Sequence, residues 1–182
     1  MVTFWQDPLS YVLHLPLAQW LGLLAFLLGI LVFWQRNDKK LKMYMVLLSV
    51  VYTLHFLLLD AHISALTSFI SGCRTLFSIF VCSPYIAFTF VAMMIAIGGY
   101  TATSAISLLP IIGSTSGTIA LFLLTGIKMR LLMLMGSLCW LINNILIGSI
   151  GGVLLELTVI GVNGFTIIRM LRYRTSYYNR FK

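Results

Sequence analysis

Charged side chains are scarce in this sequence. They make up 9% of the 182 residues, whereas hydrophobic residues make up 60%. In soluble globular domains roughly a quarter of the residues are charged. A water-soluble fold of this size could not cover its surface with the few charged side chains of this chain. The chain instead offers apolar stretches of about 20 residues, the length that a bilayer core of about 30 Å requires. We therefore predict a polytopic membrane protein of the all-α class.

Residues that carry disulfide, metal or catalytic chemistry are also few. The chain has 3 cysteines, 4 acidic residues and 3 histidines. The cysteines are odd in number and lie in or beside predicted helices, which excludes a disulfide framework and a metal-ligand spacing. A membrane enzyme usually places paired acids, a histidine set or a Ser/His/Asp set at one depth, and no such cluster occurs here. We expect neither an enzyme nor a bound cofactor.

The apolar stretches predict seven transmembrane helices in a single membrane domain. Polar, glycine-containing or proline-containing segments separate them. The predicted spans are residues 17–34, 43–59, 63–81, 84–100, 108–127 and 131–148, and a last helix from the glycine-rich hinge at 148–152 to about residue 171. Residues 1–16 lack the positive region and cleavage site of a signal peptide, and we expect them to lie at the membrane interface.

Positive charge falls on one side of this topology. Lys and Arg in short loops stay on the cytoplasmic side of a membrane. Seven spans place the basic clusters at 36–42, 128–130 and 169–182 on one face, and Asp60 and His62 on the other. We therefore predict an N-terminus outside and a C-terminus in the cytoplasm. The net charge of +8 then reflects topology and contact with anionic lipids, and not nucleic-acid binding.

The chain also shows a weak internal repeat. Residues 17–81 and 108–171 each hold three helices with a basic first loop and a tight second turn, and the odd helix 84–100 gives the two triplets the same orientation. This pattern predicts a parallel arrangement of three, one and three helices, as in many transporters. Laying residue 49 over residue 137 matches Ser49 with Ser137, Tyr52 with Trp140, His55 with Asn143, Asp60 with Gly148 and Ser68 with Glu156.

Several short stretches carry a family resemblance. They are Trp20-Leu21-Gly22, residues 25–30, 55–59, 74–76 and 108–113, Gly148-Ser149-Ile150-Gly151-Gly152, Asn163-Gly164 and residues 167–169. Over most of its length the chain resembles the bacterial inner-membrane YgjV family. That family looks like a relative of the PQ-loop group, which includes SWEET sugar carriers and PnuC vitamin carriers. The resemblance implies a SWEET-like plan, an inner-membrane location and movement of small polar solutes through a central cavity.

Three ionisable residues fall inside predicted spans. Glu156 has two interpretations, a proton or substrate site and a hydrogen-bonded packing residue, and we expect it to be mostly neutral in the bilayer. For Arg74 we favour snorkelling of the guanidinium to the cytoplasmic interface. His55 could titrate, although a satisfied core histidine is the commoner outcome. The family often has a His-Asn pair where this chain has Asn143-Asn144, which argues against a titrating role there.

The remaining candidates are amides and aromatic rings in apolar helices. Asn143, Asn144 and Asn163 need hydrogen-bond partners and either join helices or contact a solute. Tyr52 and Trp140 align in the repeat and either stack on a solute or pack in the core. With His55 and Glu156, these residues form our predicted substrate site.

Two functions remain open at this stage. The first is a facilitator for a small polar solute, such as a sugar or vitamin, in which polar residues from both repeats meet in one cavity. The second is a non-transporting scaffold or regulator, in which those groups are consumed in bonds between helices. The expected partners are membrane lipids and a small polar solute, with assembly into a homo-oligomer as a further option.

Overall fold

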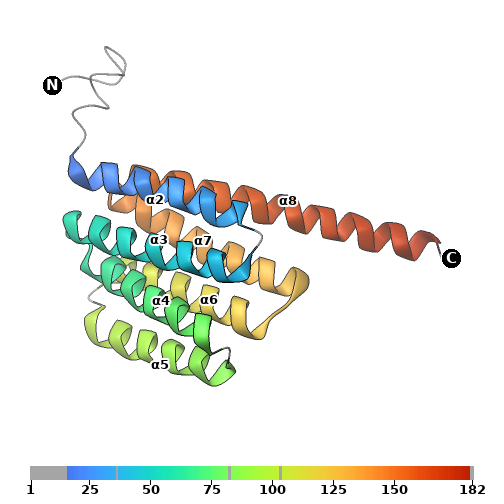
Figure 1. Ribbon diagram of the computed structural model, residues 1–182, viewed down its shortest axis with the longest axis horizontal. Helices are drawn as coiled ribbons and strands as arrows, with labels where there is room; N and C mark the ends of the chain where they lie inside the picture. Colours follow the sequence, from blue (N-terminus) through green and yellow to red (C-terminus); the bar gives the residue numbers. More distant parts are fainter. Residues whose placement is uncertain (1–15, 36, 82, 103, 181–182) are drawn as a thin grey trace, which may run out of the picture.

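The computed structural model describes residues 16–35, 37–81, 83–102 and 104–180, all of them helical or in turns between helices. The predicted interfacial lead-in lies outside these residues except for Pro16. The helices are α2 (Leu17–Trp34), α3 (Asp38–Leu58), α4 (His62–Phe80), α5 (Pro84–Thr101), the short η1 (Ile106–Leu108), α6 (Leu109–Leu123), α7 (Gly126–Leu146) and α8 (Ile150–Arg180) (Figure 1). The all-α class is confirmed.

Six of the helices form a closed ring. Helices α2, α3 and α4 make one row, and α8, α7 and α6 make a second row that faces it (Figure 1). The ring closes where α2 packs on α8 and where α4 packs on α6. Helix α5 lies outside the ring against α4 and α6. The first and second rows therefore enclose a central space that α5 does not border.

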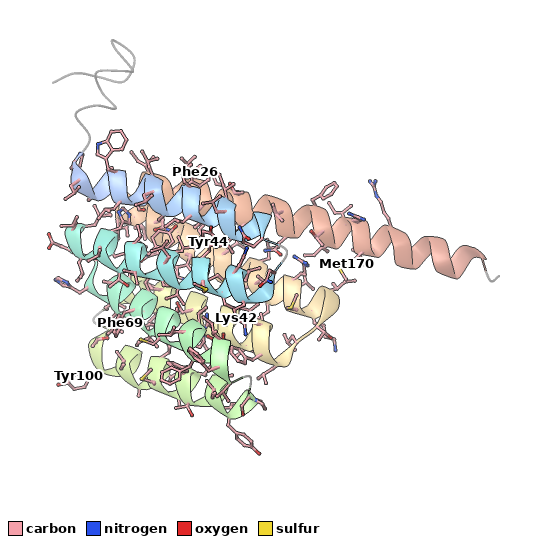
Figure 2. All side chains as sticks on the ribbon, in the orientation of Figure 1. Phe26, Lys42, Tyr44, Phe69, Tyr100 and Met170 are labelled. Carbon is pink, nitrogen blue, oxygen red and sulfur yellow. The ribbon has the colours of Figure 1, made fainter. Side chains whose placement is uncertain are left out.

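The outside of the bundle is apolar, as contact with lipid tails requires. Large side chains such as Phe69 and Phe165 are exposed, and Tyr100 projects away from the bundle (Figure 2). The helices α3 to α8 each contain a stretch long and apolar enough to cross a membrane, in α6 together with η1. The apolar part of α2 is shorter, Leu17–Val32. Length and composition thus support six of the seven predicted spans.

Four predicted helix boundaries were wrong. Helix α3 begins at Asp38 and not at residue 43, because the Asn37 side chain accepts hydrogen bonds from the Lys39 and Lys40 amides and caps it. Helix α6 ends at Leu123 instead of residue 127, and α7 begins at Gly126, which has a φ of 62°. Helix α8 continues to Arg180 instead of ending near residue 171. No glycine or proline interrupts residues 165–180, so nothing in the sequence stops this helix.

The two tight turns within the rows share one backbone conformation. Asp60, between α3 and α4, has a φ of 54°, and Gly148, between α7 and α8, has a φ of 71°. Both values lie in the left-handed region, which glycine enters freely and which Asp tolerates better than most residues. The alignment of the two helix triplets in the sequence pairs these same two positions.

The contact between α2 and α8 depends on two glycines. A Cβ atom on Gly151 would overlap the backbone carbonyl of Gly22, so the two helix backbones touch directly. A Cβ atom on Gly22 would lie 2.8 Å from Cε1 of His55. The backbones of the two rows therefore approach here as closely as two glycines allow.

We predict that Gly151→Ala forces α2 and α8 apart and lowers the free energy of unfolding by about 1–3 kcal/mol, the usual cost of overpacking. Gly161→Ala, in the same helix, is the matched control, because nothing lies within 4 Å of a Cβ atom built there. Thermal unfolding of both purified variants in one detergent measures the difference. Equal midpoints for the two variants would contradict the direct backbone contact.

Candidate functional site: a central cavity between the two rows

A cavity of about 450 Å³ lies between the two rows of helices. Its volume falls in the range of small-molecule sites. All six ring helices contribute to its walls, so both predicted repeats line it. Four of the seven predicted site residues reach it, namely Tyr52, Trp140, Asn144 and Glu156.

Aromatic rings cross the bundle from α3 to α7 at one level of the cavity. The rings of Tyr52 and Phe56 stack with centroids 5.1 Å apart, and those of Phe56 and Trp140 stack with centroids 5.6 Å apart. Phe56 was missed in the sequence, although it lies four residues after Tyr52 and therefore on the same face of the helix. The stack places an aromatic surface beside the cavity from both rows.

Two of the lining residues carry buried polar atoms without partners. The Tyr52 hydroxyl and both polar atoms of the Asn144 amide have no hydrogen-bond partner among the described residues. The Asn144 side chain is 1% exposed. A buried polar group left unpaired costs about 1–3 kcal/mol, which a packing role alone does not offset. Asn143 Nδ2 and Thr115 Oγ1, which do not line the cavity, are also buried without a partner in the described part of the chain, and all of these atoms are covered by neighbouring protein atoms.

Glu156 brings a carboxyl group from α8 to the same level. It lies beside the Ser137 hydroxyl of α7 and within electrostatic range of the Tyr52 hydroxyl. Ser49 and Ser137, which align in the repeat, also line the cavity. Hydroxyl, carboxyl and amide groups thus converge on one space from both rows.

His55 lies in a contact between helices instead of the cavity wall. Its ring is fully buried, with Nδ1 2.6 Å from the Ala18 carbonyl oxygen and Nε2 2.7 Å from Ser149 Oγ. A carbonyl oxygen only accepts, so Nδ1 carries the hydrogen, and in the neutral ring Nε2 accepts from the Ser149 hydroxyl. Both ring nitrogens therefore have hydrogen-bond partners, as expected for a histidine that packs in the core.

Asn143 and Asn163 likewise join helices. Asn143 Oδ1 accepts a hydrogen bond from the Ser64 hydroxyl of α4 at 3.2 Å. Asn163 Oδ1 accepts from the Arg130 guanidinium of α7 at 3.0 Å. Neither amide is among the residues that line the cavity. His55, Asn143 and Asn163 are therefore outside the cavity lining, although the His55 ring lies with its centroid 6.2 Å from that of Tyr52.

A further amide, Gln19, was not predicted. Its Nε2 donates to the Gly148 carbonyl at 2.7 Å, and its Oε1 accepts from the Ile150 amide at 3.1 Å. These bonds attach the start of α2 to the turn between α7 and α8. The signal in the sequence is a single amide near the start of an otherwise apolar helix.

The snorkelling interpretation of Arg74 is wrong. The side chain is only 7% exposed, lines the cavity and donates a hydrogen bond to the Thr118 hydroxyl of α6. Thr118 in turn donates to the Ser114 carbonyl of its own helix at 2.7 Å. The cavity therefore contains one guanidinium and one carboxyl group. Within the described part of the chain, no group of three or more His, Cys, Asp and Glu residues could hold a metal ion.

Comparison with known proteins agrees with a membrane location. A family model described as bacterial inner membrane protein, Imp-YgjV, matches residues 16–174. Inner membrane protein YgjV of Escherichia coli K12 is 34% identical over 166 residues, which cover 91% of each chain. No solved structure matches this chain.

We predict that Ser149→Ala lowers the free energy of unfolding by about 1–3 kcal/mol, because His55 Nε2 and the Gly152 amide each lose a buried partner. Thr89→Ala is the matched hydroxyl deletion. Thr89 is exposed on α5, and its hydroxyl bonds only the Tyr85 carbonyl of its own helix. Thermal unfolding in detergent compares the two variants, and similar losses in both would refute the role of Ser149 between helices.

Proposed function

The chain belongs to the YgjV family of bacterial inner membrane proteins, and from this premise we propose that it is a facilitator that carries a small polar solute, such as a sugar or a vitamin, across the inner membrane. The observation that supports the proposal is the cavity, which both rows line and whose walls include the polar residues Arg74, Ser137 and Glu156. A scaffold would be expected to consume such groups in bonds between helices. His55 and Asn163 are consumed in this way, whereas Arg74 and Glu156 keep their charged or carboxyl groups at the cavity wall.

The proposed carrier has two triple-helix units, α2–α4 and α6–α8, joined by α5. The position of α5 outside the ring and the matching left-handed turns at Asp60 and Gly148 support this division. A further match comes from Lys42 and Arg130, which align in the same register. Lys42 donates to the Ser78 carbonyl of α4, and Arg130 donates to Asn163 of α8, so each cation joins the second and third helices of its own unit.

The two ends of the bundle are held differently. At the end that carries Asp60 and His62, the hydrogen bonds of Gln19, His55 and Ser64 run from the first unit to the second. At the other end, which carries Lys39, Lys128 and Arg169 and which we call the basic end, the bonds of Lys42 and Arg130 stay within one unit. The bond between the units nearest to this end is that of Arg74 with Thr118. We propose that the cavity is closed at the Asp60 end and opens toward the basic end, where Leu41 and Leu121 line it.

We further propose that the basic end faces the cytoplasm, because Lys and Arg in short loops are retained there. The N-terminus is then outside, and the structure is the inward-facing state of an alternating-access cycle. Opening the other end requires that the bonds between the units break.

The orientation predicts the labelling of single cysteines in a variant without Cys73, Cys82 and Cys139. A cysteine at Lys128 or at the cavity residue Leu121 should react with a membrane-impermeant maleimide only in inside-out vesicles. A cysteine at exposed His62 should react only in right-side-out vesicles or intact spheroplasts. Labelling of positions 62 and 128 from the same side would refute the orientation, and protection of Leu121→Cys from both sides would refute the inward opening.

The carrier proposal predicts that Asn144→Leu retains stability but loses transport. Removal of the unpaired amide costs no hydrogen bond, so the unfolding midpoint should not fall, while uptake into proteoliposomes should drop at least about tenfold for loss of a polar solute contact. A panel of labelled sugars and vitamins tested with wild-type protein supplies the solute.

Asn143→Leu is the matched control in the adjacent residue. It breaks the bond with Ser64, so its midpoint should fall, while solute affinity in the folded fraction stays within about twofold. Stable wild-type protein that takes up no solute, or an Asn144→Leu variant with full uptake, would favour the scaffold.

A further inference from the structure

We propose that the solute is a small organic anion, with a carboxylate group that binds Arg74 inside the cavity. This inference rests on the carrier function proposed above and names its substrate class. Arg74 is a lining residue of the cavity, and its side chain is 7% exposed. Its position toward the basic end places it along the way by which a solute enters from that side.

The guanidinium of Arg74 has little compensation within the protein. It has five N–H donors, and its hydrogen bond to the Thr118 hydroxyl is the one interaction it makes with the described side chains. Its charge therefore has no anionic partner among the acids whose side chains are described, Asp60 and Glu156. A buried cation without an anion is strongly unfavourable in a membrane interior. A bound anion would supply the missing charge.

Glu156 lies at a different depth and forms no ion pair with Arg74. Arg74 lies twelve residues after His62, the first residue of α4, whereas Glu156 lies six residues after Ile150, the first residue of α8. Both helices start at the same end of the bundle (Figure 1). At about 1.5 Å per residue, the two residues differ in depth by about 9 Å. An anion in contact with Arg74 is therefore attracted more strongly than it is repelled by Glu156, because the interaction falls with distance.

The depths of the other lining residues indicate the shape of the rest of the solute. Tyr52 and Trp140 lie six residues before the ends of α3 and α7, which is also the depth of Glu156. An elongated molecule can place its anionic group at Arg74 and a ring or hydroxyl groups at these residues. Hydroxyl groups would pair with polar lining residues such as Ser137, and a ring would stack on Trp140. Sugar acids and aromatic acids both have this form.

Matched pairs of compounds test the charge requirement on the wild-type protein without any variant. Gluconate is compared with sorbitol, and benzoate with benzamide, by the shift in unfolding temperature of purified protein in a neutral detergent. We expect a saturable upward shift with at least one anion, and none with its neutral counterpart. Shifts of equal size within both pairs, or no shift with either anion, would overturn the inference.

Arg74→Gln then tests the residue. The anion affinity should fall at least about tenfold, while Arg74→Lys should give an intermediate value because it keeps the charge but loses the planar fork. Lys42→Gln is the control, since it removes a cation at the same end of the bundle that does not line the cavity; its anion affinity should stay within about twofold. An equal loss in Arg74→Gln and Lys42→Gln would overturn the assignment to Arg74.

Two further results separate this inference from the carrier function. Uptake of neutral sugars by both wild type and Arg74→Gln would leave the carrier intact and overturn the anionic substrate. An Arg74-dependent shift caused by short-chain phosphatidylglycerol but not by gluconate or benzoate would assign the site to a lipid headgroup and also overturn it.

Discussion

Polar groups inside a membrane bundle must find their partners within the protein, because lipid tails offer none. This constraint divides the polar residues of the ring into two sets. Gln19, His55 and Asn163 are paired across helix contacts. Asn144 and Tyr52 hold unpaired buried atoms at the cavity wall. The first set holds the helices together, and the second set lies at the wall of the space that we propose a solute occupies.

The hydrogen bonds between the two rows are more numerous at one end of the bundle than at the other. Four hydrogen bonds join the two rows at the Asp60 end, next to the backbone contact of Gly22 with Gly151. Each hydrogen bond contributes a net of about 0.5–1.5 kcal/mol to stability, so the four together contribute roughly 2–6 kcal/mol. In the proposed carrier, a solute could open this end only if its affinities for the two states differ by a free energy of the same size.

The sequence predicted the helices better than it predicted which face each residue takes. Apolar length located all seven helices, and the alignment of Asp60 with Gly148 located two turns of the same conformation. It could not choose between Asn143 and Asn144, because consecutive residues point about 100° apart on a helix and only the packing of neighbours decides which one meets Ser64. Arg74 was misjudged for a related reason. Its depth suited snorkelling, but its direction depends on where α6 places Thr118.

The two ionisable residues of the cavity belong to different rows, Arg74 to the first and Glu156 to the second. A solute that binds Arg74 and stacks on Trp140 of the second row would interact with the two halves of the proposed carrier at once. Its binding free energy depends on how far apart the rows stand, and this dependence is what a ligand needs in order to shift a conformational equilibrium. A group that contacted Arg74 alone would bind equally well whatever the separation of the rows. In the proposed carrier, this distribution of contacts over both rows would link solute recognition to movement of the helices that enclose it.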